Sequence, residues 1–389
     1  MEQEQRLRKR GVVNDDEDRF NLLSEALILK ILCFLPTKTV VTTSVLSKQW
    51  RSLWKLVPNL EFNSEDCESE DLSFSDIVSK SFLSHKAPVL DSFRLLFGSE
   101  DVSFVDVGLW VGIAFARHLR ELVLDFYPSG KETFSYFSSL CTCNTLESLK
   151  LVYGFTVDIP SPVLMKSLRT LHLEFVSFKD DASRLKIHDT NDGAEFWGYL
   201  INAPCLKYLQ IEDLRCPGFS LNAPELVEAS IVEVVSITNK KLLGSLTCVK
   251  RLLLHLSPLR RWWNLLTLVL ENSPKLQVLK ITDKYHHVGG NSLVSGKWNE
   301  PKYIPGCLLS HLETFVWKRF DWGRAEEKEI ATYILKNARR LKKAHFSTIP
   351  TESKELNKLR ERRKVLSELD GVVRASNSCH LVFKFDSSA

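Results

Sequence analysis

Short hydrophobic segments of one spacing recur along most of the chain. Each reads x-Leu-x-x-Φ-x-Φ, where Φ is apolar, except that Val249 replaces the leucine in one, and the positions between are mostly polar or charged. This alternation is typical of β-strands with one buried face. Nine segments fit the spacing and a tenth, at Val89, also fits; the nine begin at His118, Thr145, Ser167, Cys205, Glu225, Cys248, Lys275, His311 and Arg340. The pattern therefore predicts about ten short strands.

The nine segments lie about 28 residues apart on average, from Leu119 in the first to Leu341 in the last. Periods of about 20–29 residues are those of leucine-rich repeats, in which one short strand per repeat stacks into a parallel sheet. One such unit cannot bury its own leucines, whereas stacked neighbours bury them in one elongated core. Unrelated strands in an α/β domain are the alternative. The number and spacing of the segments favour a curved α/β leucine-rich-repeat solenoid.

The connectors between the segments indicate helices. Asn-small-Pro triplets at 202–204, 222–224 and 272–274 precede three of the strands. Asn tolerates the left-handed geometry that ends a helix, and Pro blocks its continuation. Apolar-faced helices are therefore predicted over 194–201 and 262–271, and another over 326–336, before Asn337. The two longest intervals contain insertions, at 177–193 and 283–303, which we expect in loops.

Residues 18–58 differ in kind and predict three short helices. Ser24 is a good N-cap for the first, and Pro36 ends it. Ser47 caps the third. We expect Leu27, Ile28, Ile31, Leu32 and Leu35 on one face of the first helix, Val40, Val41, Ser44 and Val45 inward on the second, over 37–46, and Trp50, Leu53 and Trp54 on the third. So small a block cannot hide this much apolar surface alone. It either packs on the end of the solenoid or presents an apolar surface to another protein.

Charge and composition argue against several classes of protein. A net charge of +4 over 389 residues is no footprint for nucleic acid. The longest uncharged apolar run, Gly108 to Ala116, has nine residues, whereas a membrane span takes about 20. The charged N-terminus is not a secretory signal, and nine scattered cysteines favour a reducing compartment. Arg6 to Arg10 reads as a nuclear localisation signal or as an ordinary basic tail, so we expect a nuclear or cytoplasmic location, or both.

No catalytic, cofactor or metal motif stands out. Walker, GxGxxG, HExxH and GxSxG patterns are absent from the sequence. The CxC of Cys141 and Cys143 lacks the paired ligands of a zinc site, and His286-His287 reads as a surface loop. Tryptophans at 262–263 and 317–322 favour packing over a ligand pocket. The basic segment 360–364 is expected on a solvated helix face. We therefore expect neither cofactor nor metal.

Two regions resemble a known family. The segments DRF, FLPTK and SVLSKQWRSLW resemble the F-box of plant F-box proteins. The segments HLETFVWKRFDW, EEKEIATYILKNARRLKKAHFST and HLVFKF resemble the FBD region that many plant F-box/leucine-rich-repeat proteins carry. One departure is clear, because Leu23-Ser24 stands where the family has Leu-Pro. Ser still caps the helix, but the loss of proline's rigid entry is expected to weaken docking by about 1 kcal/mol.

The resemblance implies a function. Such proteins dock their F-box on a Skp-type adaptor bound to a cullin, and their repeats hold a target protein for ubiquitination. The chain is then a non-catalytic ubiquitin-ligase subunit; a non-degradative scaffold that binds the adaptor is the alternative. Carried over by position, the adaptor-binding residues are Leu23, Leu27, Ile31, Leu32, Leu35, Val45, Leu46, Trp50 and Trp54, of which about half are expected in the block's own core.

The expected domain organisation has five parts. Residues 1–17 form a tail, 18–63 the F-box and 64–71 an acidic linker. The repeat solenoid spans 72–307, and its edge is expected to be capped by a helix over 72–86 and a strand near Phe93. Residues 308–389 form the FBD-like region. The fold class is therefore α/β, with three N-terminal helices, a curved solenoid and the FBD-like region.

Overall fold

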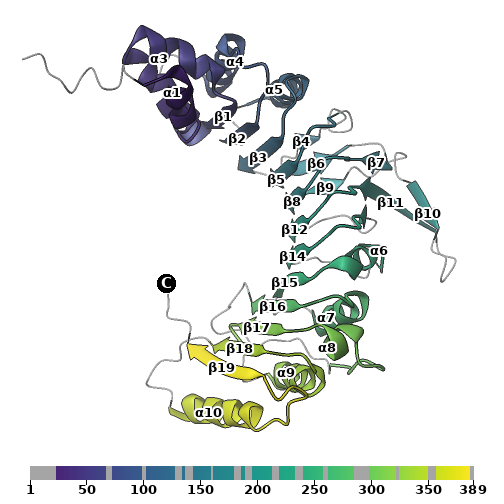
Figure 1. Ribbon diagram of the computed structural model, residues 1–389. Helices are drawn as coiled ribbons and strands as arrows, with labels where there is room; N and C mark the ends of the chain where they lie inside the picture. Colours follow the sequence, from purple (N-terminus) through teal and green to yellow (C-terminus); the bar gives the residue numbers. More distant parts are fainter. Residues whose placement is uncertain are drawn as a thin grey trace, which may run out of the picture.

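The strands of the protein stack into one long curved sheet in a computed structural model of the chain (Figure 1). The structure describes residues 23–66, 72–98, 102–127, 134–135, 143–158, 161–178, 185–188, 195–212, 219–232, 240–256, 262–283, 298–320, 324–348 and 356–385. A helical block lies at the N-terminal end of the sheet, and a helix and the C-terminal strand lie at the other end. The architecture is thus mixed α/β, with N-terminal helices followed by a strand-rich sheet.

The main sheet of the described residues has twelve strands, and all neighbours are parallel. All ten predicted strands form, and each begins at the fourth position of its segment. Two further strands, β1 and β19, extend the sheet at its ends. In sheet order the strands are β1 (Asn59–Asn63), β2 (Ser92–Gly98), β3 (Glu121–Tyr127), β5 (Ser148–Val152), β8 (Thr170–Glu174), β12 (Tyr208–Glu212), β14 (Glu228–Val232), β15 (Arg251–Leu256), β16 (Val278–Asp283), β17 (Thr314–Lys318), β18 (Lys343–Thr348) and β19 (His380–Phe385).

The leucine spacing explains the core. The second, fifth and seventh positions of each segment are buried; in the first segment these are Leu119, Leu122 and Leu124. The same positions of neighbouring strands lie side by side, so their side chains merge into one continuous core. The alternate strand positions point to the opposite side, which we call the inner face. The connecting segments lie on the outer, convex side, and the inner face faces the hollow of the curve (Figure 1).

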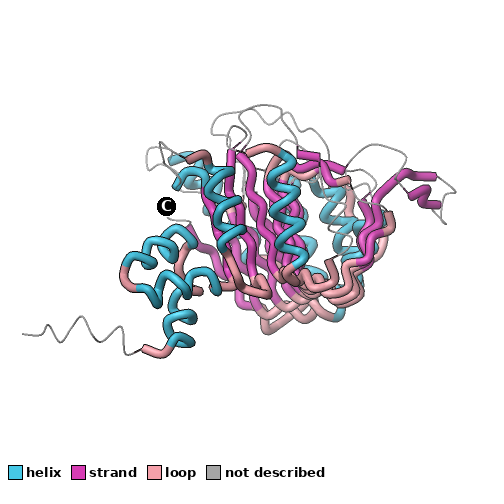
Figure 2. Tube along the Cα trace, turned by 90° about the horizontal axis from the view of Figure 1, so that it is seen from above, coloured by secondary structure: helices cyan, strands magenta, loops and turns pink. Residues whose placement is uncertain are grey.

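In the described part of the chain, helices connect the strands at both ends of the sheet but not in its middle. These connecting helices are α4 (Phe74–Ser84), α5 (Phe104–Ala116), α6 (Lys240–Gly244), α7 (Trp262–Asn272), α8 (Gly306–Ser310), α9 (Ala325–Asn337) and α10 (Leu356–Asp370). The predicted helices over 262–271 and 326–336 are confirmed as α7 and α9. Figure 2 shows the helices packed along one side of the strands.

The middle connectors are strands, and the prediction of a helix over 194–201 is wrong. That segment is β11 (Glu195–Asn202), which pairs with β7 (Val163–Leu164), β10 (Leu185–His188) and β13 (Phe219–Asn222). A second small sheet contains β4 (Phe134–Ser135), β6 (Phe155–Val157) and β9 (Ser177–Phe178). In β11 the buried residues Tyr199 and Ile201 alternate with period two, and Gly198 disfavours a helix.

Two of the three Asn-small-Pro triplets therefore end strands, not helices. Asn202 ends β11 and Asn222 ends β13, and the Asn222 amide donates to Asn202 Oδ1 at 2.8 Å. Only Asn272 ends a helix, and its side chain donates to the Leu268 carbonyl at 2.7 Å. Asn337 ends α9 in the same way, on the Tyr333 carbonyl at 2.9 Å. The expectation of loops in the insertions is wrong where the first one is described, because residues 177–178 and 185–188 form β9 and β10. Residues 179–184, 189–193 and 284–297 of the insertions lie outside the described ranges.

The N-terminal block contains three helices, as predicted. They are α1 (Glu25–Leu32), α2 (Thr37–Thr42) and α3 (Lys48–Leu53); short 3-10 turns, η2 (Thr43–Val45) and η3 (Trp54–Leu56), follow α2 and α3. The predicted second helix over 37–46 is thus α2 and η2 together. The expected capping of the sheet by a strand near Phe93 is wrong, because β1 lies outside β2 and forms the edge. No helix among the described residues is long and apolar enough to cross a membrane.

Candidate functional site

The first helix of the block is fixed by its caps. The Ser24 hydroxyl accepts a hydrogen bond from the Leu27 amide at 3.4 Å, so serine does cap α1 in place of proline. Glu25 in the first turn and Lys30 in the last complement the helix dipole. The Pro36 backbone then caps α2, and the Ser47 hydroxyl caps α3. These caps fix the residues at which α1, α2 and α3 begin.

The block has a small core of its own, separate from that of the sheet. Two residues that were expected to contact the adaptor, Leu32 and Trp50, are buried in this core. Their side chains are enclosed by the block and present no surface to a partner in this arrangement. The residues that form the core are Ile28, Leu32, Val40, Trp50, Leu53 and Val57.

Other apolar side chains of the block point to solvent. Leu27 and Ile31 are 51% and 45% exposed, and Phe34, just beyond the helix, is 81% exposed. Their spacing of four and three residues places them on one stripe of α1 and the turn that follows. Val45 and Leu46, in η2 and just after it, are 80% and 65% exposed. We call these five residues the apolar stripe, although Val45 and Leu46 come from a second segment.

The apolar stripe corrects the sequence interpretation in two places. Val45 was expected inward on the second helix, but it lies at the end of η2 and faces solvent. Phe34 was not predicted as a site residue, although its place three residues after Ile31 was a usable signal. Leu23, Leu35 and Trp54 are partly buried and pack against the block's core. Large apolar groups left in water are typical of protein interfaces.

The block is joined to the start of the sheet by hydrogen bonds. The Thr37 hydroxyl accepts a hydrogen bond from the backbone amide of Glu61 in β1 at 2.7 Å. The side-chain amide of Asn59 donates to the Cys33 carbonyl at 3.3 Å. Strand β1 is an edge strand, so Thr37 satisfies one of its outward-facing amides. A hollow of about 260 Å³ lies at this junction, between α2, β1 and α4. The block therefore packs on the sheet and also leaves an apolar surface exposed to solvent.

A buried histidine supports the junction from the other side. His85 Nε2 donates to the Val57 carbonyl at 2.7 Å, and Nδ1 accepts from Arg117 at 2.9 Å. Burial lowers the pKa of His85, and the neighbouring Arg117 guanidinium lowers it further, although the bond to Val57 opposes them. The imidazole is therefore held neutral, with its proton on Nε2.

The inner face carries charged side chains in its middle. His172 and Glu174 of β8 form a contact of 3.2 Å, and Lys150 of β5 is the ladder neighbour of His172. Desolvation, and then Lys150, lower the pKa of His172 to about 4, although Glu212 opposes the shift. Desolvation raises the pKa of Asp125 on β3. Tyr153 and Phe175 stack beside this row at 4.6 Å, and both have positive φ.

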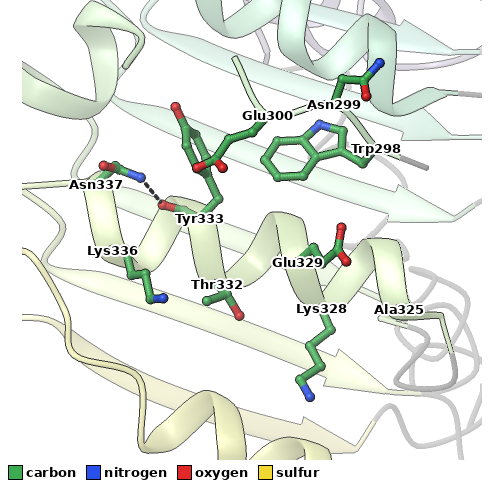
Figure 3. Close-up of a pocket in the computed structure, with 10 residues that line it drawn as sticks. All are labelled: Trp298, Asn299, Glu300, Ala325, Lys328, Glu329, Thr332, Tyr333, Lys336 and Asn337. Atoms are coloured by element: carbon green, nitrogen blue, oxygen red, sulfur yellow. Dashed lines mark hydrogen bonds between the residues drawn. The ribbon is translucent and has the colours of Figure 1, made fainter. Parts of the chain in front are cut away.

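A second hollow lies near the C-terminal end, on the helical side of the sheet (Figure 3). Its volume is about 670 Å³. Glu329 and Tyr333 of α9 lie on the side of the helix toward Trp298 and Glu300, whereas Lys328, Thr332 and Lys336 project from its other side. The Trp298 indole donates to Thr267 at 3.2 Å. The wall mixes both signs of charge and shows no set of groups that converges on one reacting atom.

Aromatic and cysteine side chains mostly serve packing. Trp317 is buried in the core, as expected of a packing residue, whereas the side chains of Trp262, Trp263 and Trp322 lie outside the described part. Burial raises the pKa of Cys307 to about 12, which makes it a poor nucleophile. Of the CxC pair only Cys143 is described, as a free thiol. His286-His287 and Arg6 to Arg10 fall outside the described ranges, within which no group of three metal-ligating side chains occurs.

Comparisons with known proteins find a matching domain family for one region near the N-terminus and for one in the C-terminal part of the chain. An F-box domain model matches residues 20–62, and an FBD model matches residues 300–346. The chain is similar to an F-box/FBD/LRR-repeat protein of Arabidopsis thaliana, at 64% identity over 100% of this chain and 97% of the relative. A second such Arabidopsis protein is 61% identical over 100% and 98%. An Arabidopsis FBD-associated F-box protein is 58% identical over 95% and 98%.

Proposed function

Because the chain belongs to the family of plant F-box/FBD/LRR-repeat proteins, we propose that it is the substrate-recognition subunit of a Skp–cullin–F-box ubiquitin ligase. In this proposal the N-terminal block docks on a Skp-type adaptor, and through it on a cullin. The inner face of the sheet holds a target protein. The observation that carries the proposal is the apolar stripe, which lies inside the matched F-box and is exposed to solvent.

The twelve-stranded sheet would be the leucine-rich-repeat part of this subunit. The buried leucines at fixed positions, the parallel order and the relatives' names support that reading. Stacked repeats create long concave surfaces that suit protein recognition. The target would therefore lie against the inner face, at a distance from the apolar stripe.

The apolar stripe would be the centre of the adaptor interface. Leu27, Ile31 and Phe34 present one row, and desolvation of such a row is the main source of affinity in helix-in-groove recognition. Val45 and Leu46 would add a second contact. Leu23, Leu35 and Trp54 would contribute from their exposed edges, and Leu32 and Trp50 would support the stripe from inside.

The subunit would contribute position and no catalytic group. Holding a target beside a reactive ubiquitin conjugate raises its effective concentration, which is enough to accelerate transfer. No cofactor or metal is needed for this role. The proposed location is the nucleus, the cytoplasm or both.

The test is co-purification of the full chain with a plant Skp-type adaptor. The wild-type chain should retain the adaptor, and the double substitution Leu27→Asp with Ile31→Asp should abolish retention, because two carboxylates would be buried unpaired. Leu83→Asp is the matched control, since Leu83 is 86% exposed on α4, outside the block. It should leave retention unchanged.

Two results would contradict the proposal or its finer form. If the wild-type chain does not bind the adaptor, while a known F-box protein binds it in the same experiment, the proposal is contradicted. Adaptor binding without a cullin, and without accumulation of any bound protein after proteasome inhibition, favours a non-degradative scaffold instead.

A further inference from the structure

The charges on the inner face are segregated along the sheet. From β1 to β14 the described inner-face positions hold six carboxylates and two cations. The carboxylates are Glu61, Glu121, Asp125, Glu174, Glu212 and Glu228, and the cations are Arg94 and Lys150. His172 is neutral at pH 7, because its pKa is about 4. The part of the face formed by the seven N-terminal strands is therefore acidic.

From β15 to β19 the sign reverses. Every charged inner-face position in the described part of these strands is basic: Arg251, Lys280, Lys318, Lys343 and Lys384. Arg251 is paired, at 2.8 Å, with Glu228 of the neighbouring strand. The other four lysines are exposed, and within the described residues none of them has an acidic partner. We call these four the basic end.

The ladder registers place the basic end on one compact area. Lys280 pairs with Val316, two residues before Lys318, and Lys343 pairs with His380, four residues before Lys384. Strands lie about 4.8 Å apart and residues two apart in a strand about 6.7 Å apart, so the four lysines span an area about 14 Å wide. His345 and His380 lie among them on the same face.

Lysines at this density repel one another, and a bound anion relieves that repulsion. An extended peptide advances about 3.3 Å per residue, so the width of the basic end matches four or five residues. Acidic side chains are the complementary charge. Surface ion pairs are individually weak, at about 0.2–1 kcal/mol, so several must act together.

We propose that the basic end of the inner face binds a short acidic segment of the target protein. The inference rests on the proposed function, because it names what the inner face would hold. The FBD model covers β17 and the first four residues of β18, which include Lys318 and Lys343, so the FBD region would supply part of the target-binding surface. An acidic segment fits better than a long polyanion, since a longer chain of negative charge would run onto Glu228, Glu212 and Glu174.

Binding is measured with the full-length protein and a fluorescein-labelled peptide of six glutamates, by fluorescence anisotropy. We expect binding at low salt that weakens as salt rises. The double substitution Lys280→Gln with Lys318→Gln should weaken it about 2-fold to 30-fold, the equivalent of two surface ion pairs. Lys166→Gln with Lys336→Gln is the control, because both lysines are exposed and lie outside these strands.

A charge reversal provides a gain of binding that misfolding cannot imitate. Lys280→Glu with Lys318→Glu should lose the glutamate peptide and bind a labelled peptide of six lysines more tightly than the wild type, whose acidic strands give the background for that peptide. Absence of glutamate-peptide binding by the wild type, or equal binding by wild type and Lys280→Gln with Lys318→Gln, would overturn the inference. Tighter binding of a twelve-nucleotide single-stranded DNA to the same lysines would also overturn it, in favour of a nucleic-acid site.

Adaptor co-purification of the same samples separates the two proposals. Retention of the adaptor by Lys280→Gln with Lys318→Gln, together with weaker binding of the glutamate peptide, supports both. If the wild type binds the peptide but not the adaptor, the ligase role fails and the acidic-segment site stands. If it binds the adaptor but not the peptide, only the acidic-segment site fails.

Discussion

At the scale of single residues, His172 shows how the inner face couples charge to stability. Its ring is mostly buried between Lys150 and Gln210 on the neighbouring strands, and it donates to Glu174 at 3.2 Å. Burial and Lys150 keep its pKa near 4, below the ordinary value of 6.5. Between these two values the unfolded chain binds a proton that the folded chain does not.

The sign of the resulting pH dependence follows from linkage. Because the unfolded state binds more protons, His172 lowers the free energy of unfolding as the pH falls from 6.5 to about 4. We expect His172→Gln to remove this loss. In urea unfolding at pH 7 and pH 5, the stability of the variant relative to wild type should rise at pH 5. An unchanged difference at the two pH values would show that His172 is not held neutral.

Leu27 and Leu32 show what residue-level sequence reasoning resolved and what it did not. The apolar spacing predicted α1 and placed both residues on one face. That face is wide enough to be divided, and α3 covers only the side that carries Ile28 and Leu32. Which half is buried depends on where the third helix packs, a fact that the spacing along one helix does not contain.

At the scale of elements, Thr37 ties the helical block to the sheet. The Thr37 side chain is buried, and its hydroxyl accepts the Glu61 amide of the edge strand β1. Thr37→Val keeps the shape but leaves that amide without its partner, which should cost about 1–3 kcal/mol. Hydrogen exchange of the α2 and β1 amides measures the effect. Thr37→Ser keeps the hydroxyl and is the control; equal protection in the two variants would contradict the role assigned to the bond.

The connectors were the element least open to prediction. The segments before β12 and β16 both combine apolar residues with an Asn-small-Pro ending, yet the first is β11 and the second is α7. Periodicity separates helix from strand poorly in eight residues. Neighbouring segments decide between helix and strand here, because β7, β10 and β13 supply hydrogen-bond partners for the backbone of β11.

At the scale of the whole molecule, the net charge of +4 does not reveal that acidic and basic residues are separated along the inner face. Acidic and basic residues alternate in sequence often enough to cancel, but the ladder places them in separate parts of one surface. The overall charge argued against nucleic acid and said nothing about this separation. Only the register of the strands brings Lys280, Lys318, Lys343 and Lys384 together.

The C-terminal segment closes the sheet, and its removal should cause self-association. Strand β19 pairs with β18 over six residues, and Phe383 packs on Phe346 at 5.8 Å. A chain that ends after Thr348 lacks α10 and β19. It would expose the apolar surface that α10 covers and the edge of β18, and such a strand edge pairs readily with other chains. Light scattering after size-exclusion chromatography should show oligomers. A chain that ends after Phe385 retains every described element and should behave as the full chain; monomeric behaviour of the shorter chain would contradict the closing role of β19.

The sequence by itself determined the strands, the helical block and the family. Leucines at fixed spacing bury one face wherever such strands stack, so the ten segments and their core positions could be read without knowledge of the neighbours. Tertiary structure decided everything that depends on contacts between distant segments: the extra edge strands β1 and β19, the strand identity of β11, the exposure of Phe34 and Val45, and the sorting of charge on the inner face. Burial and pairing are properties of two or more segments, whereas periodicity is a property of one.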